Sequence, residues 1–491
     1  MPEDLRRKEG DQVILQRSLV LADMKALEKY ASRVRVFCES EQPSVSIYRV
    51  LCSFCLNYLL PRLETLIWRV EEPEAFSYIR FFLSPTLKGV SLYPSKALSS
   101  DSLGILSSMP VLFFSDVSQL KLSIPCFSGT GMRVSDLSRA LFNWKSLSEL
   151  DAWGVPIDTI RCVVELPKLR HLRLSLTCQP SVSQALHGPI PVSSNPQKSA
   201  LETIFIEEIT SITLLSQIMT LCHFYKLRSL QLVFQEASNP QGTFETLSAA
   251  IIDSCDRKSL ETLHFQFKLS DIPSFRTLTN PFFTFSELRN FSISSESYPT
   301  TLSQQEVEEI ASAWPQLELL ALTSVHSNTP AITLSSLISV ARKCPNINFL
   351  RLTLDASNSS ARHDLREQPG MLLGAQNYTL RKLYLTRSSP ITHKEFVASL
   401  LATIFPNLES IVLIPLGSTV SSRMYHHRWK EVTDLLLPFL NRAREMHYLA
   451  LGTSPPYAVH VEDSARDSFL NRARINFDKT ELRDEDLSDV E

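Results

Sequence analysis

A pattern of apolar and intervening positions, apolar-x-x-apolar-x-apolar, recurs along most of the chain. Clear copies begin at Leu63, Leu87, Leu169, Leu227, Leu260, Leu288, Leu317, Ile347, Leu380 and Leu408. Looser copies begin at Ala31, Val117, Leu147, Leu201 and Met446. One such hexapeptide is a weak signal because leucine is common. Fifteen copies with a mean spacing of about 30 residues indicate a repeat.

Each repeat is predicted to contain one short strand and one helix. Apolar residues alternate with a period of two in the recurring pattern and with a period near 3.6 in the residues between copies. Prolines such as Pro315 and Pro345 lie just before the next copy, where they end a helix and favour extended backbone in the preceding residue. Helices are predicted over residues 48–59, 134–144, 214–224, 246–255, 307–314, 334–344, 396–405 and 429–441.

Two of these helices are preceded by residues with the spacing of a capping box. Ser303 stands three residues before Glu306, and Thr392 stands three residues before Glu395. In such a box, the hydroxyl and the carboxylate each accept a hydrogen bond from a backbone amide that the helix leaves unpaired. We therefore expect the helices to begin at these two positions.

A unit of one strand and one helix cannot bury its apolar face alone, so neighbouring units must stack. The predicted fold is an α/β leucine-rich-repeat solenoid (horseshoe) of about fifteen irregular units, with a parallel β-sheet on the concave face and helices on the convex face. We expect a lead-in helix or linker over 1–30, the solenoid over 31–453 and an acidic, disordered tail over 454–491. Phe-Leu-Asn-Arg-Ala-Arg at 439–444 returns at 469–474, which indicates a partial duplication.

Side chains between the leucines of each strand should face the concave side, because neighbouring residues of a strand point to opposite faces. The residue between the last two apolar positions of each copy then forms one row. This row is expected at Arg35, Ile67, Ser91, Lys121, Asp151, Arg173, Phe205, Gln231, His264, Ser292, Ala321, Arg351, Tyr384, Val412 and Ala450.

Arginine and aromatic side chains dominate the binding free energy of many protein interfaces. The row and its flanking positions are rich in such residues, so the concave face is the expected site for a protein partner. The candidate partner-binding residues are Lys121, Trp153, Arg173, Phe205, His264, Arg351 and Tyr384.

Composition and charge narrow the classes of function. A net charge of −3 over 491 residues gives no chain-wide attraction to nucleic acid or anionic lipid. Only 12 glycines leave few places for a phosphate-cradling loop, and no Gly-x-Ser-x-Gly, Walker-type or His-Glu-x-x-His sequence occurs. No stretch reaches the roughly 18 apolar residues of a membrane span, and the first residues lack the apolar stretch of a secretory signal. We expect no catalysis, cofactor or metal, and neither nucleic acid nor membrane as a partner.

Cysteine and histidine pairs give no strong sign of a metal site. Nine cysteines, an odd number, favour reduced thiols and a cytoplasmic or nuclear location. Cys52 and Cys55 have the spacing of half a zinc site, but no second ligand pair follows nearby, so we interpret them as core residues. The sequence places no carboxylate beside His426 and His427, which we interpret as the solvated start of a helix.

Several segments near the start of the repeats are similar to a known family. They are Arg17-Ser-Leu-Val-Leu-Ala-Asp23, the stretch 30–36, Leu-Leu-Pro-Arg-Leu-Glu-Thr-Leu at 59–66 and Phe-Leu-Ser-Pro-Thr-Leu at 82–87. With them, the chain resembles the leucine-rich-repeat F-box-like proteins of mushroom-forming fungi from about residue 17 to about residue 454.

This resemblance implies a substrate receptor of an SCF-type ubiquitin ligase. In that family the F-box binds a Skp-family adaptor and the solenoid presents the substrate. An F-box is a helical module longer than the sixteen residues that precede Arg17. We therefore expect this sequence to lack the F-box, and a Skp-family partner is expected only if an F-box is encoded upstream.

Three functions fit these observations. The first is a substrate-recognition arm related to F-box proteins, and the second is a free-standing protein-interaction scaffold without a ligase link. The third is a leucine-rich-repeat GTPase activator, which the sequence favours least because no loop arginine stands out as a catalytic finger.

Alanine replacement of five row residues tests the concave-face hypothesis. The residues are Arg173, Phe205, His264, Arg351 and Tyr384. We expect the variant to capture a protein partner more weakly and to keep its melting temperature nearly unchanged, because these side chains face away from the core. Pull-down and thermal unfolding measure the two effects, and undiminished capture would show that the hypothesis is wrong.

Overall fold

The computed structural model divides the 491-residue chain into two compact units, Met1–Leu440 and Asn441–Glu491. The described part of the second unit, 441–451, is helical. The structure describes residues 6–9, 12–38, 42–43, 45–53, 58–70, 73–94, 100–112, 117–124, 134–155, 157–176, 197–220, 222–235, 240–268, 274–295, 303–324, 332–357, 372, 374–386, 389–414 and 420–451.

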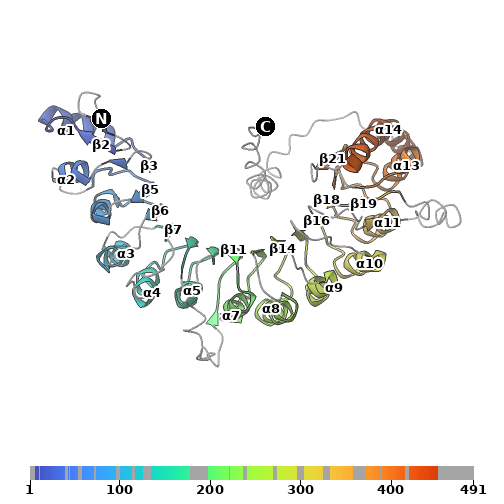
Figure 1. Cartoon of the computed structure of the whole chain (residues 1–491), viewed down its shortest axis with the longest axis horizontal. Helices are drawn as coiled ribbons and strands as arrows, with labels where there is room; N and C mark the ends of the chain where they lie inside the picture. The colour runs from blue at the N-terminus through green and yellow to red at the C-terminus, as the bar shows by residue number, and fades with distance from the viewer. Residues whose placement is uncertain are drawn as a thin grey trace. The chain divides into compact units, whose positions relative to one another are not determined.

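Among the described residues of the first unit, 14 strands form one sheet in which every neighbouring pair is parallel (Figure 1). Their order in the sheet follows their order in the chain. They are β3 (Val36–Cys38), β5 (Thr65–Val70), β6 (Gly89–Pro94), β7 (Gln119–Ser123), β8 (Glu149–Trp153), β9 (His171–Ser175), β11 (Thr203–Ile209), β13 (Ser229–Phe234), β14 (Thr262–Phe267), β15 (Asn290–Ser295), β16 (Leu319–Ser324), β18 (Phe349–Leu352), β20 (Lys382–Thr386) and β21 (Ser410–Ile414).

The helices that connect these strands lie along one side of the sheet (Figure 1). We call the opposite side the helix-free face. The helices are α1 (Leu21–Ala31), α2 (Val45–Ser53), α3 (Ser100–Leu112), α4 (Val134–Phe142), α5 (Ile157–Val164), α7 (Ile212–Thr220), α8 (Pro240–Ser254), α9 (Phe275–Thr279), α10 (Gln304–Ala313), α11 (Leu334–Lys343), α13 (Lys394–Ile404) and α14 (Val420–Leu451), with 3-10 turns η2 (Pro73–Phe82) and η3 (Asn280–Thr284). The predicted α/β leucine-rich-repeat solenoid with a parallel sheet is confirmed.

Short strands outside the large sheet pair among themselves. β1 (Arg6–Glu9), β2 (Gln12–Leu15) and β4 (Gln42–Pro43) form a three-stranded sheet. β10 (Gln197–Lys198) pairs with β12 (Cys222–His223), and β17 (Ile332–Thr333) pairs with β19 (Leu354–Asp355). The expected lead-in segment thus contains helix α1 and also a hairpin that the sequence did not predict.

The apolar positions of the repeated pattern form the core between the sheet and the helices. In the sheet register, Leu263 of β14 pairs with Leu230 of β13 on one side and with Phe291 of β15 on the other. All three side chains have 0% exposure. Because the same alignment recurs at each strand, the core is one continuous apolar layer in the first unit.

The prolines before the strands end their helices through one recurring turn. After α10, the N–H of Leu317 donates a hydrogen bond to the carbonyl of Trp314 at 3.2 Å, with Pro315 at the second position of the turn. The same bond closes the turns after α11 and α13. Proline suits this position because its φ is fixed near the required value and no N–H is needed there.

The predicted helices all exist, with shifted ends. α2 begins at Val45, three residues before the predicted start, and Tyr58 and Leu59 are not helical. The helix predicted over 214–224 is α7, which ends at Thr220, and the residues that follow include the strand β12. Helices α3, α5 and α9 were not predicted.

The capping box at Ser303 is confirmed, since its hydroxyl accepts from the Glu306 amide and the Glu306 carboxylate accepts from the Ser303 amide. The one at Thr392 is wrong. The residue that caps α13 is His393, without a side-chain bond, and the Thr392 hydroxyl donates to the Ser357 carbonyl at 3.0 Å.

The first and last copies of the pattern were placed wrongly. In β3, Cys38 pairs with Ile67, so the true frame begins at Val34 and Cys38, rather than Arg35, starts the predicted row. At the other end, Met446 and Ala450 belong to α14, so no strand forms there. Both copies were loose matches, and β3 and β21, the strands at the two edges of the sheet in the described residues, each have a neighbouring strand on one side only. The second copy of the duplicated hexapeptide, 469–474, and the predicted tail over 454–491 lie outside the described residues.

Truncation of one core phenylalanine tests the packing of the stacked units. The Phe265 ring has 0% exposure and lies 5.5 Å from the Phe282 ring and 5.7 Å from the Phe244 ring, centroid to centroid. We expect Phe265→Ala to lower the free energy of unfolding by about 3–5 kcal/mol, because a cavity replaces the ring. Denaturant unfolding measures this. The control Phe142→Ala removes a ring that is 48% exposed on α4 and should cost less than about 1 kcal/mol. Equal losses of unfolding free energy in the two variants would contradict this packing.

Candidate functional site

The predicted row on the helix-free face is confirmed as a line of register partners from Ile67 to Val412. Each row member pairs with the next one across the sheet: Ile67, Ser91, Lys121, Asp151, Arg173, Phe205, Gln231, His264, Ser292, Ala321, Arg351, Tyr384 and Val412. The register therefore places side chains from 13 consecutive strands in one line. The register does not bring all the candidate residues together.

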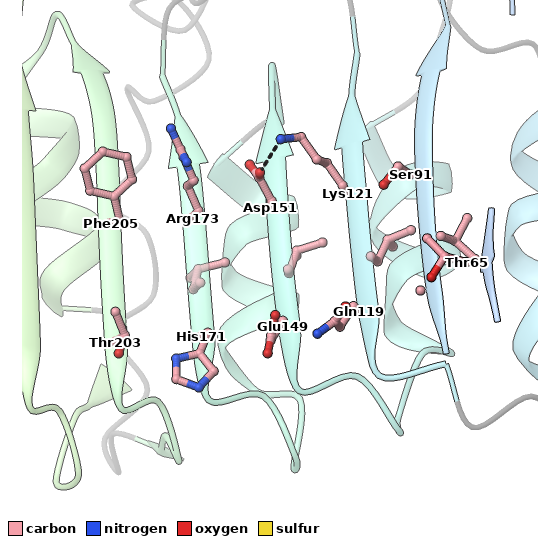
Figure 2. A pocket seen from close by; sticks show the side chains of 15 residues that line it. Thr65, Ser91, Gln119, Lys121, Glu149, Asp151, His171, Arg173, Thr203 and Phe205 are labelled. Carbon is pink, nitrogen blue, oxygen red and sulfur yellow. Dashed lines mark ion pairs between the residues drawn. The ribbon is translucent and has the colours of Figure 1, made fainter. Parts of the chain in front are cut away.

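Four of the candidates, with two acidic neighbours, form one cluster on β7, β8, β9 and β11, and Figure 2 shows four of its members, Lys121, Asp151, Arg173 and Phe205. Its members are Lys121, Asp151, Trp153, Arg173, Phe205 and Glu207, which we call the Arg173 cluster. The other candidates lie further along the sheet: His264 is on β14, and Arg351 and Tyr384 pair with one another on β18 and β20.

Ion pairs hold both cations of the Arg173 cluster. Lys121 Nζ lies 2.9 Å from Asp151 Oδ2, and Asp151 Oδ1 accepts a hydrogen bond from Trp153 Nε1 at 2.9 Å. Burial opposes the charge of Lys121, but the hydrogen bond and the charge of Asp151 outweigh it, so the pKa of Lys121 lies above its usual value. Asp151 thus orients two neighbours, Lys121 and Trp153.

The Arg173 guanidinium is fixed from two sides. Its Nε and Nη2 donate to Glu207 Oε1 and Oε2 at 3.2 and 3.1 Å, which is the bidentate geometry that arginine forms with carboxylates. Its central carbon also lies 4.6 Å from the centroid of the Phe205 ring, within cation–π range. The guanidinium plane and the ring therefore present a preformed surface on the helix-free face.

Glu207 lies two residues after Phe205 on β11 and pairs with Ser175 of β9, just before a β-bulge. The register with β13 shifts between Ile206 and Ile209, and Glu208 adopts the left-handed conformation with φ 58°. The Glu208 carboxylate accepts a hydrogen bond from the Ser175 hydroxyl. The repeated pattern predicted neither glutamate, although the apolar residues at 206 and 209, three positions apart rather than two, mark the bulge in the sequence.

A glycine fixes the end of β8, next to Trp153. Gly154 has φ 72°, and a Cβ at this position would collide with the carbonyl oxygen of Ile124. That approach accompanies a hydrogen bond from the Ile124 N–H to the Trp153 carbonyl at 3.0 Å. The backbone that carries Trp153 is therefore fixed as well as its indole.

A hollow of about 330 Å³ extends over β5 to β11 and includes part of the Arg173 cluster (Figure 2). On β6 the face positions are Gly89 and Ser91, which are small, while β7 beside them carries Gln119 and Lys121. The wall also includes Glu149 and His171, so an otherwise largely apolar lining contains polar groups and both signs of charge. Such a hollow can accept a side chain or loop of another molecule.

His264 is half-buried between Gln231 and Ser292, its register partners on the neighbouring strands. Burial lowers the pKa of His264 to about 4, so the imidazole is neutral at pH 7. This candidate therefore differs from Arg173 and Lys121, which carry full charges at neutral pH.

The remaining sequence candidates show no metal or redox centre among the described residues. Cys52 is buried in α2, and Cys55 lies outside the described residues. Burial raises the pKa of Cys255 and of Cys344 to about 12, so neither thiol forms a thiolate at neutral pH. No group of three His, Cys, Asp or Glu side chains in the described part of the chain could hold a metal ion.

His427 has a carboxylate partner that the sequence analysis did not recognise. Its Nδ1 lies 3.3 Å from Glu431 Oε1, one helical turn later in α14, and Glu431 Oε2 also lies 2.9 Å from Lys394 Nζ. The histidine side chain is 76% exposed, so the contact is a surface pair on the helix. The pair lies inside α14 rather than at its start.

Comparisons with known proteins add little to this description. No protein-family model matches the chain, and no curated protein does either. One solved structure with some similarity is the leucine-rich repeat-containing protein LegL7 from Legionella pneumophila, with 10% sequence identity, a TM-score of 0.34 and coverage of 70% of this chain and 97% of that one. The fold assignment therefore rests on the strands and helices of this chain. Of the helices in the described segments, none combines the length and the apolar character needed to cross a membrane.

Acid should destabilise the fold through His264. Its folded pKa of about 4 lies below the usual 6.5, so the unfolded state binds more protons between these values and stability falls as the pH drops through this range. We expect wild type to lose on the order of 2 kcal/mol relative to His264→Gln between pH 7 and pH 4.5. Denaturant unfolding of both proteins at each pH measures the difference. A pH-independent difference would contradict the burial of the imidazole.

Proposed function

We propose that this chain is a non-catalytic protein-binding solenoid whose helix-free face binds a protein partner at the Arg173 cluster. The observation that carries the proposal is the fixed geometry of Arg173, held by Glu207 and by the Phe205 ring on neighbouring strands. A side chain that is ordered before binding loses less conformational entropy when a partner arrives. Arginine, tryptophan and tyrosine are also the side chains that most often dominate interface energies.

The charges of the cluster favour a protein surface over a polyanion. Lys121 and Arg173 each face a carboxylate, Asp151 and Glu207, so the cluster has no excess positive charge. Phosphate backbones are bound mainly by clustered cations, which this site does not offer. A protein surface with polar groups of both signs and an apolar contact for Phe205 fits the same site well.

A hydroxyl–carboxylate contact within the site does not support catalysis. Ser175 donates to Glu208, but the serine is 1% exposed, so a substrate could not reach its oxygen. General-base activation of a serine also requires an accessible nucleophile. We therefore assign the Ser175–Glu208 contact a structural role, which is to stabilise the bulge.

A narrower hypothesis is that the solenoid is the substrate-recognition arm of an SCF-type ubiquitin ligase. Its support is the sequence similarity of segments 17–23, 30–36, 59–66 and 82–87 to F-box-like leucine-rich-repeat proteins. Purification from native cells with a Skp-family adaptor would support it. Purification without one would favour a free-standing scaffold, and stimulated GTP hydrolysis by an added GTPase would favour the activator alternative. A cytoplasmic or nuclear location is part of the same proposal.

Site-specific photo-crosslinking tests the proposed face. A benzoylphenylalanine in place of Phe205 should form a covalent adduct with a partner in native cell extract, because the ring lies on the binding face. The control is the same residue in place of Phe142, which is 48% exposed on α4, on the helix side. We expect no comparable adduct there, and adducts of equal yield at both sites would contradict the proposal.

A second pair of variants tests the role of the fixed arginine. In the Phe205 crosslinking protein, Arg173→Ala should reduce the adduct yield about tenfold or more, the effect of losing one dominant interface residue. Arg170→Ala removes another arginine of the same strand region, which pairs with Glu202 at 3.6 Å and is 63% exposed. This control should leave the yield within about twofold.

A further inference from the structure

Among the described strands of the large sheet, Gly89 of β6 is the only glycine. It lies on the helix-free face, between Thr65 of β5 and Gln119 of β7 in the register. Glycine loses more conformational entropy on folding than any other residue, and it contributes no side chain to the sheet, so this position weakens the strand. A role other than strand stability must therefore account for the glycine.

The local fold does not require a glycine at this position. Gly89 does not adopt the left-handed conformation, in contrast to Gly154. The register of β6 with β5 and with β7 continues without a bulge. A Cβ at position 89 would lie 3.5 Å from Gln119 Oε1 and 3.9 Å from Thr65 Cγ2, which are ordinary van der Waals contacts. The remaining common reason for a glycine in a strand is the close approach of another molecule.

Gly89 lies in the wall of the hollow of about 330 Å³ on the helix-free face. Its neighbours on this face are Thr65, Gln119 and Ser91, all seen in Figure 2. Gly89 is buried although it has no side chain, so it lies at the bottom of the hollow. The volume is near the lower end of the range for ligand pockets, about 300–1,000 Å³, which suits one large side chain.

The charges in the lining of the hollow balance and favour an uncharged occupant. Lys121 and Arg173 are cationic, and Glu149 and Asp151 are acidic. A charged side chain from a partner would lose hydration here without an excess of opposite charge to compensate for it. An uncharged side chain with a large apolar part suits the otherwise largely apolar lining.

The Gln119 amide provides a polar group near the bottom of the hollow. Its Oε1 lies 3.5 Å from the position that a Cβ of residue 89 would occupy, and the side chain is exposed. A hydroxyl group can donate to the oxygen of this amide or accept from its nitrogen, so it can bond in either orientation of the amide. Among uncharged side chains, tyrosine combines such a hydroxyl with a large apolar ring.

From these features we propose that the hollow at Gly89 binds a tyrosine side chain of a protein partner. The ring covers the glycine between Thr65 and Gln119, and the phenol hydroxyl forms a hydrogen bond with the Gln119 amide. Gly89 determines which side chain is admitted, because a larger residue at this position would occupy the place of the ring. This inference rests on the proposed function, since it names the group that a partner inserts into the same face.

Ligand-observed NMR with the full chain tests the proposal. The probe is the peptide acetyl-Gly-Ala-Tyr-Ala-Gly-amide, and matched peptides have Phe, Lys or Ala in place of Tyr. One side chain supports only weak binding, with a Kd on the order of 1 mM, which saturation-transfer titrations can measure. We expect the Tyr peptide to bind about threefold to tenfold more tightly than the Phe peptide, the effect of one hydrogen bond. Equal binding of the Tyr and Ala peptides, or tighter binding of the Lys peptide, would overturn the proposal.

Two variants fill the hollow. Gly89→Leu and Ser91→Leu each place a side chain in this space and should weaken binding of the Tyr peptide about tenfold or more. Thermal unfolding shows whether each variant folds, and a folding defect at one position leaves the other as the test. The control Gly104→Leu changes an exposed glycine of α3 with open space around it, and binding should stay within about twofold. Unchanged binding in a folded filling variant would overturn the proposal.

The smaller change Gly89→Ala separates a binding role from a structural one. The added Cβ makes ordinary contacts, so we expect the melting temperature to stay the same or to rise. The Tyr peptide should bind about threefold more weakly, because the methyl group reduces the space for the ring. A lower melting temperature with unchanged binding would show that the glycine serves the strand.

The Gln119→Leu variant tests the hydrogen bond to the phenol. It replaces the amide by an apolar group of similar size, so the Tyr peptide should lose its preference over the Phe peptide. Binding of the Phe peptide should stay within about twofold. A preference for Tyr that persists in this variant would contradict the role of Gln119.

The Phe205 crosslink separates this inference from the proposed function. Phe205 lies on β11, at the other end of the hollow. We expect Gly89→Leu or Ser91→Leu in the Phe205 crosslinking protein to reduce the adduct yield about tenfold, and Gly104→Leu to leave it within about twofold. If the adduct forms with equal yield in the filled variants, the face binds proteins without the hollow and this inference is wrong. If no adduct forms in any of these proteins, the proposed function itself is contradicted.

Discussion

Burial of the repeated leucines beneath the parallel sheet is the constraint on which the rest of this structure depends. A single unit has one short strand and one helix, and it covers its apolar side chains only by stacking on its neighbours. Leu230, Leu263 and Phe291 illustrate the result, because they align across three strands with 0% exposure. A slip of one residue in any strand would turn this apolar set toward the helix-free face. The core therefore fixes the register, and the register fixes the row of side chains on the opposite face.

Charged residues just before the strands favour the same alignment. The second position of the repeated pattern pairs across neighbouring units, as in Arg289 with Glu318 at 3.0 Å and Arg381 with Glu409 at 3.4 Å. The side chains are about half exposed, so each pair contributes below about 1 kcal/mol. These ion pairs favour the native register, since a shifted neighbouring strand would lose its oppositely charged partner.

The helix-free face does not form the core, and its large side chains lie in two areas. In the Arg173 cluster, Asp151 and Glu207 form ion pairs with Lys121 and Arg173 and fix their positions. Further along the sheet, the Phe349 ring of β18 stacks on the Tyr384 ring of β20, with 4.7 Å between the ring centroids. Between them the face is lined by smaller side chains, with Ser292 and Ala321 only 7% and 4% exposed.

The sequence by itself determined the features that depend on local period: thirteen of the fifteen strand frames, the proline turns, the cap at Ser303 and the line of face residues from Ile67 to Val412. Only the tertiary structure decided which of those residues meet. The contacts of Arg173 with Glu207, and of Phe349 with Tyr384, join residues 34 and 35 positions apart in sequence. Three local predictions failed: the cap at Thr392, the frame at Ala31 and the strand at Met446. At these places contacts with a neighbouring unit, or a position at the edge of the sheet, outweighed the local pattern. The spacing of apolar residues is set within one unit, whereas the binding face combines side chains from several neighbouring units.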